Sequence, residues 1–124
     1  MLLQGPADAA AVDAVRSRVR GRPPVVLRDD PPSRLKGVLA RCGLFLGNDG
    51  GVTHLAALMG VPTVAVFGPS DPVRWAPRGP RVQVVRSPAP CSPCTAEALQ
   101  ECADRVCLSR VETPEVLEAC RRTM

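Results

Sequence analysis

The chain has 124 residues, of which 45% are hydrophobic and 23% charged, and its formal net charge at pH 7 is +4. This composition is typical of a globular protein and excludes a disordered chain, and the length allows a single domain over residues 1–124. Aromatic residues make up only 2% of the chain, so the stacking surface of single-stranded nucleic-acid binders is absent. The basic residues form no dense cluster either, and we expect no nucleic-acid partner.

Apolar runs alternate with helical patterns along the whole chain. The runs predict short strands at 2–3, 25–27, 44–46, 63–67 and 81–85. The helical patterns predict helices at 8–19, around 35–42, within 47–60 and at 113–122. This alternation favours an α/β fold with a doubly wound, Rossmann-like parallel sheet. The proline-rich stretch 68–77 and the cysteine-rich stretch 88–110 are expected to be loops.

No apolar stretch approaches the roughly 18 residues that a membrane span requires, so no transmembrane segment is expected. Residues 1–4 lack the charged and apolar regions of a signal peptide, which favours the cytoplasm. In that compartment the six Cys residues are expected to be free thiols or metal ligands rather than disulfides. Two of them, Cys42 and Cys120, lie on apolar helix faces and are predicted to be small core residues.

The stretch 47–60 joins a short strand to a helix through a glycine turn. It contains Asp49, Gly50, Gly51 and His54, and the last is the only His of the chain. In doubly wound sheets ligands bind at the carboxyl ends of the strands, where glycines and free N–H groups at a helix start suit a phosphate. The alternative is a helix entry that Asp49 caps, with His54 as an ordinary boundary residue.

Four cysteines of the stretch 88–110 have the spacing C-x2-C-x7-C-x4-C, and they are Cys91, Cys94, Cys102 and Cys107. Four thiolates could bind one structural Zn²⁺ tetrahedrally, although two C-x2-C pairs are the commoner arrangement. One or two disulfides, or four free thiols, are alternatives that the spacing leaves open. Trp75, in the loop 68–77, likewise has two interpretations: it could cover an adenine or sugar ring, or it could pack the loop onto the sheet.

Two motifs resemble glycosyltransferase family 9, the ADP-heptose:lipopolysaccharide heptosyltransferases. The first is Asp-x-Gly-x-x-His, present here as Asp49, Gly51 and His54. The second is the loop Phe-Gly-Pro-Ser-Asp-Pro at 67–72. The similarity extends to most of the chain, and cysteine-rich loops occur in relatives. One departure is Gly50, where the family often has Ser or Thr, which removes a hydroxyl donor to phosphate.

The resemblance implies a GT-B fold, in which two Rossmann-like domains close over a nucleotide-sugar. It implies an inverting transfer from an ADP-sugar to a lipopolysaccharide core acceptor, without a metal cofactor, in the cytoplasm or peripherally at the inner face of the membrane. The residues that would contact the donor fall in two groups. The turn contributes Asp49, Gly50, Gly51, Thr53 and His54. The loop after the fourth strand contributes Ser70, Asp71 and Arg74.

The resemblance covers only part of such an enzyme. The N-terminal acceptor domain with its general base, and the first strand of the C-terminal domain, have no counterpart in the sequence. That strand is central in the order 3-2-1-4-5-6, so we expect the remaining strands to close the gap, or another chain or self-association to fill it. We therefore expect a donor-binding domain that is not active alone. The alternatives are a non-catalytic interaction module and, more weakly, a nucleotide-sugar epimerase.

Overall fold

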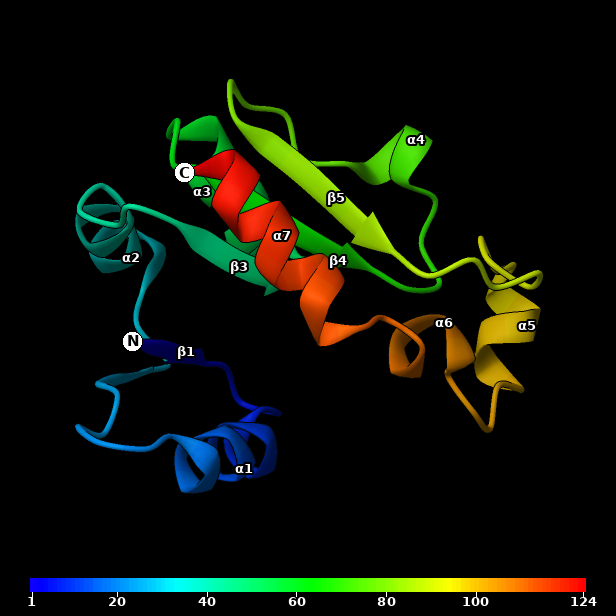
Figure 1. Cartoon of the computed structure of the whole chain (residues 1–124), viewed down its shortest axis with the longest axis horizontal. Coiled ribbons are helices and arrows are strands. Elements are labelled where there is room, and N and C mark those ends of the chain that lie inside the picture. The colour runs from blue at the N-terminus through cyan, green and yellow to red at the C-terminus, as the bar shows by residue number, and fades with distance from the viewer. The chain divides into compact units, whose positions relative to one another are not determined.

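The computed structural model describes all 124 residues and divides them into two units, Met1–Leu35 and Lys36–Met124. The helices and strands are labelled in Figure 1. Helix α2 (Pro32–Leu39) begins in the first unit and ends in the second. The longest helix of the chain has 11 residues, and none is both long and apolar enough to cross a membrane.

The first unit is a small β-α-β arrangement. Strands β1 (Leu2–Gln4) and β2 (Val26–Arg28) pair in parallel, and helix α1 (Ala9–Arg18) connects them along the chain. Helix α1 contacts β1 and buries Val12. The predicted strands and helix are therefore present, with bounds shifted by one residue or two.

The second unit is built on three parallel strands in the order β3-β4-β5, which Figure 1 shows side by side. Their bounds are Phe45–Asn48, Thr63–Phe67 and Val82–Arg86. The central strand β4 is almost wholly buried, because it has a neighbour on each edge and helices on both faces. This explains why residues 64–67 are all apolar and why its bounds could be predicted without error. The one polar residue of the strand, Thr63, donates its hydroxyl to the Val61 carbonyl oxygen.

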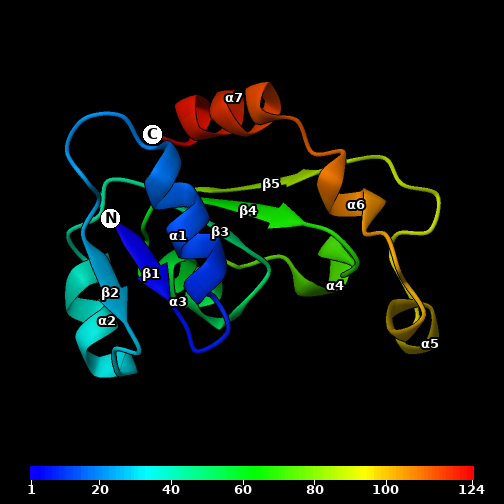
Figure 2. The same ribbon diagram turned by 90° about the horizontal axis from the view of Figure 1, so that it is seen from below.

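Helices cover the two faces of this sheet separately. Helix α7 (Thr113–Thr123) packs on β4 and β5, where Val64, Val85 and Cys120 form one cluster. Helix α3 (Gly51–Leu58) contacts β3 and β4, and its Ala56 joins Leu39 in a second cluster. Figure 2 shows α7 and α3 on opposite sides of the strands. The doubly wound α/β architecture is thereby confirmed.

The five strands form two sheets, β1-β2 and β3-β4-β5. The strands β1 to β5 correspond to strands 2 to 6 of the six-stranded order 3-2-1-4-5-6. Without strand 1, that order leaves the pairings 3-2 and 4-5-6, which are the two sheets found here. What fills the place of the missing strand stays a prediction.

Three short helices lie in stretches that were expected to be loops. Helix α4 (Pro72–Trp75) follows β4, while α5 (Ala96–Gln100) and α6 (Val106–Ser109) lie in the cysteine-rich stretch. Local caps explain the first two: the Asp71 carboxylate accepts a hydrogen bond from the Val73 N–H, and the Thr95 hydroxyl accepts one from the Ala98 N–H. Helices of four or five residues are too short to show a clear apolar periodicity in sequence.

Candidate functional site

The glycine turn after β3 is held together from inside by Thr53. Its hydroxyl donates a hydrogen bond to the Asn48 carbonyl oxygen at 2.5 Å, and its side chain is only 3% exposed. A Cβ atom on Gly47 would lie 2.9 Å from this hydroxyl and 2.7 Å from the Phe45 ring. The turn can therefore close over Thr53 only if residue 47 has no side chain.

Helix α3 begins directly after this turn, and its first backbone N–H groups have no hydrogen-bond acceptor in the protein. Gly50 is the N-cap, in extended conformation, and no side chain caps the helix. Of the two interpretations of this stretch, the helix entry that Asp49 caps is therefore contradicted. The N–H groups of Gly51 and Val52 find no acceptor within the protein and point out of the helix start. Neither Gly50 nor Gly51 has a neighbour that crowds it, so the backbone is open to a ligand.

The carboxylate of Asp49 lies beside the imidazole of His54 and does not cap the helix. The distance from His54 Nε2 to Asp49 Oδ1 is 3.6 Å, and the two side chains are 37% and 22% exposed. One acidic and one imidazole group thus sit together at the carboxyl end of β3, beside the free N–H groups of α3. This combination offers an acceptor for sugar hydroxyls and donors for phosphate oxygens.

The far end of α3 is fixed by a Schellman motif. The Gly60 N–H bonds the Ala57 carbonyl at 2.9 Å, the Val61 N–H bonds the Ala56 carbonyl at 3.1 Å, and Gly60 has a φ of +77°. This left-handed conformation favours glycine. The helix that presents His54 therefore has a defined length, as the sequence predicted from Gly60.

The loop after β4 packs against the cysteine-rich stretch. The Ser92 hydroxyl donates to the Gly68 carbonyl at 2.7 Å, and the Cys94 N–H donates to the Pro69 carbonyl at 2.8 Å. Between the two segments lies a hollow of about 490 Å³. Its walls include the three predicted loop residues Ser70, Asp71 and Arg74 together with Trp75. Residues 93–99 form the opposite wall, which no sequence pattern indicates, because that contact joins segments more than twenty residues apart.

The four cysteines of the stretch 88–110 form no disulfide in the structure, and neither do the other two. Partial burial raises the pKa of the Cys94 thiol, and the neighbouring thiols of Cys91, Cys107 and Cys102 raise it further. The four therefore lie in one neighbourhood. No group of three or more Cys, His, Asp or Glu side chains converges closely enough to hold a metal ion. Of the two predicted core cysteines, Cys120 is buried and Cys42 is partly buried.

Comparison with known families decides the affiliation of this chain. The model of glycosyltransferase family 9 (heptosyltransferase) matches residues 33–103, which is more than half of the chain and includes both motifs. The chain belongs to glycosyltransferase family 9. The similarity predicted from Asp49, His54 and the loop 67–72 is thereby confirmed.

Relatives within glycosyltransferase family 9 are considerably longer. The lipooligosaccharide heptosyltransferase 2 of Campylobacter jejuni is 39% identical over 57 residues, which is 45% of this chain and 18% of that protein. The crystal structure of a family 9 glycosyltransferase from Veillonella parvula matches 98% of the chain at 24% identity, with a TM-score of 0.78. The match covers 35% of that protein, so the chain spans about a third of its length.

The predicted donor residues of this family 9 chain thus occupy two places in the second unit. Asp49, Gly50, Gly51 and His54 gather at the start of α3, while Thr53 lies beneath them in the turn. The second group, Ser70, Asp71 and Arg74, lines the hollow after β4. Gly47 was not singled out, although its close approach to Phe45 and Thr53 makes the turn possible.

Proposed function

We propose that this chain is the donor-binding part of a heptosyltransferase-like glycosyltransferase and binds a nucleotide-diphosphate sugar of the ADP-heptose class. The observation that carries the proposal is the pairing of Asp49 and His54 at 3.6 Å, beside the open start of α3, within the matched family segment. Membership of the family supplies the reaction class, and the arrangement of these groups supplies the binding role.

Each part of the turn has a separate task in this proposal. The free N–H groups of Gly51 and Val52, with the positive end of the α3 dipole, bind the diphosphate. Asp49 accepts hydrogen bonds from the sugar hydroxyls, and His54 donates to a phosphate oxygen. Thr53 supports the turn from beneath, since its hydroxyl is already bonded to Asn48.

The transfer itself needs groups that we assign to another part of the enzyme. We propose that an acceptor domain with the general base completes a GT-B architecture, and that a strand pairs beside the sheets described above. The acceptor would be a lipopolysaccharide core-type sugar, and the reaction would run in the cytoplasm or at the inner face of the membrane. The chain alone is then a binding domain without transferase activity, and inverting transfer in this proposal needs no metal.

Thermal unfolding in the presence of ADP, UDP, ADP-heptose and other nucleotide-sugars tests the binding role. A ligand present at about 100 times its dissociation constant stabilises a protein by about 2.7 kcal/mol, which for a chain of this size raises Tm by on the order of 10 °C. We expect this shift with the ADP compounds. Folded protein whose Tm does not respond to any nucleotide or nucleotide-sugar would contradict the proposal and favour a non-catalytic interaction module.

Variants at the turn identify the binding groups. Asp49→Asn removes a charged acceptor, and such hydrogen bonds contribute about 1.5–3 kcal/mol, so we expect the Kd for ADP-heptose to rise about 10- to 100-fold. Glu115→Gln is the matched control, because Glu115 is an exposed carboxylate of α7 without an ion pair. Equal losses in both variants would show a general charge effect and not a site at Asp49.

The structural Zn²⁺ site at Cys91, Cys94, Cys102 and Cys107 stays a prediction from the spacing. The thiols share one neighbourhood, yet their positions do not form a ligand set. We therefore assign zinc no part in donor binding. Metal analysis of protein purified without chelator would decide between a metal site and free thiols.

A further inference from the structure

Two of the four thiols in the cysteine-rich stretch belong to one tight turn. The Cys94 thiol donates a hydrogen bond to the Cys91 carbonyl oxygen at 3.1 Å, so the side chain of residue 94 folds back onto residue 91. Partial burial raises the pKa of Cys94, and the Cys91 thiol raises it further by its charge and by a hydrogen bond, so the two sulfur atoms are neighbours. Cys91 is exposed, and a reagent in solution therefore reaches this pair.

The other two thiols of the stretch are directed elsewhere. The Cys102 thiol donates to the Asp104 carbonyl oxygen at 3.2 Å, within its own loop. Cys107 is only 4% exposed and lies in α6. Within the stretch, Cys91 and Cys94 are therefore the pair best placed to react with each other.

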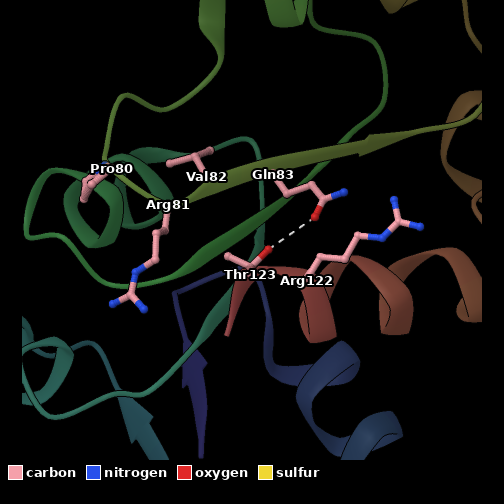
Figure 3. Close-up of a pocket in the computed structure, with 6 residues that line it drawn as sticks. All are labelled: Pro80, Arg81, Val82, Gln83, Arg122 and Thr123. Carbon is pink, nitrogen blue, oxygen red and sulfur yellow. Dashed lines mark hydrogen bonds between the residues drawn. The ribbon is translucent and has the colours of Figure 1, made fainter.

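A hollow of about 220 Å³ at the start of β5 has no comparable reactive group. Among its lining residues, Arg81 and Arg122 point in different directions in Figure 3. Arg122 Nε is bonded to Glu118 at 2.8 Å, and the Thr123 hydroxyl lies 3.3 Å from Gln83 Oε1. Its polar groups are largely occupied within the protein, which leaves the thiols as reactive groups without an assigned role.

The turn that carries the Cys91–Cys94 pair also holds the loop after β4. The Ser92 hydroxyl donates to the Gly68 carbonyl oxygen at 2.7 Å, and the Cys94 N–H donates to the Pro69 carbonyl oxygen at 2.8 Å. The same loop touches α6, since a Cβ atom on Gly68 would lie 2.6 Å from the Leu108 side chain. The position of the loop thus depends on the conformation of residues 91–94.

We propose that Cys91 and Cys94 are a redox-active dithiol, which glutathione disulfide or a similar small disulfide converts to an intrachain disulfide that loosens the loop 67–72. The Cys91 sulfur, as a thiolate, attacks one sulfur of the external disulfide and releases the other as a thiol. The Cys94 sulfur then attacks Cys91 and releases the second external thiol. Two protein thiols are oxidised, one external disulfide is reduced, and the two protons pass to the released thiols.

The environment of the two thiols sets the order of these steps. Cys91 is exposed and meets the external disulfide first. The raised pKa of Cys94 keeps its thiol largely protonated at neutral pH, which disfavours it in the first attack. In the second step its closeness to Cys91 compensates, because the reaction is then intramolecular.

Loosening of the loop follows from the residues that the disulfide would enclose. The Cys94 sulfur has to leave the Cys91 carbonyl oxygen in order to bond a sulfur atom at about 2.0 Å. The ring that closes contains Ser92 and ends at Cys94, and these two residues donate the hydrogen bonds to the loop. Closing the ring changes the backbone between residues 91 and 94 and weakens both bonds.

The consequence for donor binding rests on the proposed function, because the loop carries Ser70 and Asp71, which we assign to the donor. The reduced turn holds this loop in place, so oxidation weakens donor binding. Disulfides in reducing compartments are usually transient and redox-sensing, which fits a pair that opens again when the external thiol is in excess.

Peptide mapping tests the disulfide itself. The full chain is incubated with glutathione disulfide, its remaining thiols are alkylated, and the protein is cut after Arg and Glu. Fragment 87–97 then contains Cys91 and Cys94 without the other four cysteines. We expect this fragment to escape alkylation, to be lighter by two hydrogen atoms, and to regain both thiols with dithiothreitol. A fragment that remains reduced, carries only glutathione adducts, or is linked to Cys102 or Cys107 overturns the proposal.

Serine variants show which thiols are needed. Cys91→Ser and Cys94→Ser should each abolish the intrachain disulfide, while Cys102→Ser, the matched control, should form it in full. Circular dichroism confirms that each variant is folded. Loss of the disulfide in folded Cys102→Ser overturns the proposal. So does protein that is isolated with one Zn²⁺ per chain and whose thiols react only after a chelator is added, since the four cysteines then form a metal site.

Amide hydrogen exchange of Cys94 reports on the loop without any donor. Its N–H is bonded to Pro69, so after correction for the chemical effect of the disulfide we expect about 3- to 10-fold faster exchange in the oxidised chain. The Val61 N–H, bonded to Ala56 at the end of α3, is the internal reference and should be unchanged. Equal exchange of Cys94 in both forms contradicts the loosening of the loop.

Donor affinity separates this inference from the proposed function. Calorimetry with ADP-heptose should give a Kd about 3- to 10-fold higher for the oxidised chain, and treated Cys91→Ser should bind like the reduced chain. Equal Kd values in the presence of the mapped disulfide contradict control of the donor site. If neither form binds, the proposed function is wrong, while the mapped disulfide and the faster Cys94 exchange still support the dithiol. If the reduced chain binds and no disulfide forms, the proposed function stands and the dithiol is wrong.

Discussion

The two units of the chain differ in how much core each one builds. In Lys36–Met124 the central strand β4 is enclosed by neighbours and by helices on both faces. In Met1–Leu35 only Val12 is a buried hydrophobic residue, while Val15, Val19 and Val25 are 45%, 42% and 62% exposed. Two strands of three residues cannot be covered on both faces by a single short helix. Core formation thus depends on the number of layers around a strand more than on how apolar its residues are.

The strongest test of this difference replaces one buried side chain in each unit. Phe67 of β4 is fully buried, and Phe67→Ala should cost about 3–5 kcal/mol of unfolding free energy. Val12→Ala removes two methyl groups in the thinner unit and should cost about 1.6 kcal/mol, at roughly 0.8 kcal/mol per group. Urea unfolding measures both values. Equal losses would mean that the first unit contributes to a common core.

A second, smaller effect is expected at the turn of the better-packed unit. Gly47→Ala forces a Cβ atom against Phe45 and Thr53 and should cost about 1–3 kcal/mol by overpacking. Gly51→Ala is the matched control, since a Cβ there meets no atom within 4 Å, and its stability should be unchanged or slightly higher. Denaturant unfolding of the pair checks this. A stable Gly47→Ala variant would show that the turn does not need close packing.

The smallest expected effect is a difference in local opening. Amide hydrogen exchange should be slowest in β4, where exchange requires global unfolding, and at least about tenfold faster in β1 and β2, which corresponds to about 1.4 kcal/mol. Exchange followed by NMR measures each strand separately. Equal protection in β1 and β4 would contradict the contrast between the units and indicate that they unfold together.

Much of the second unit could be predicted because its pattern is local. The run 63–67, which is apolar after Thr63, forms β4 with the predicted bounds, and Gly60 ends α3 as its left-handed conformation requires. The position of the N-cap of α3 could not be predicted reliably from residue types. Asp is a good N-cap by type, but Gly50 occupies that position and the carboxylate meets His54 instead.

The sequence by itself determined the family and the α/β class of this protein. Both follow from motif spacing and apolar runs, which are properties of neighbouring residues. Only the tertiary structure decided that the strands form two sheets, that Thr53 lies beneath the turn, and that the segment 93–99 closes a hollow beside Trp75. These features depend on contacts such as Cys94 with Pro69, between residues far apart in sequence. Periodicity carries no information about such contacts, because they arise from how whole elements pack.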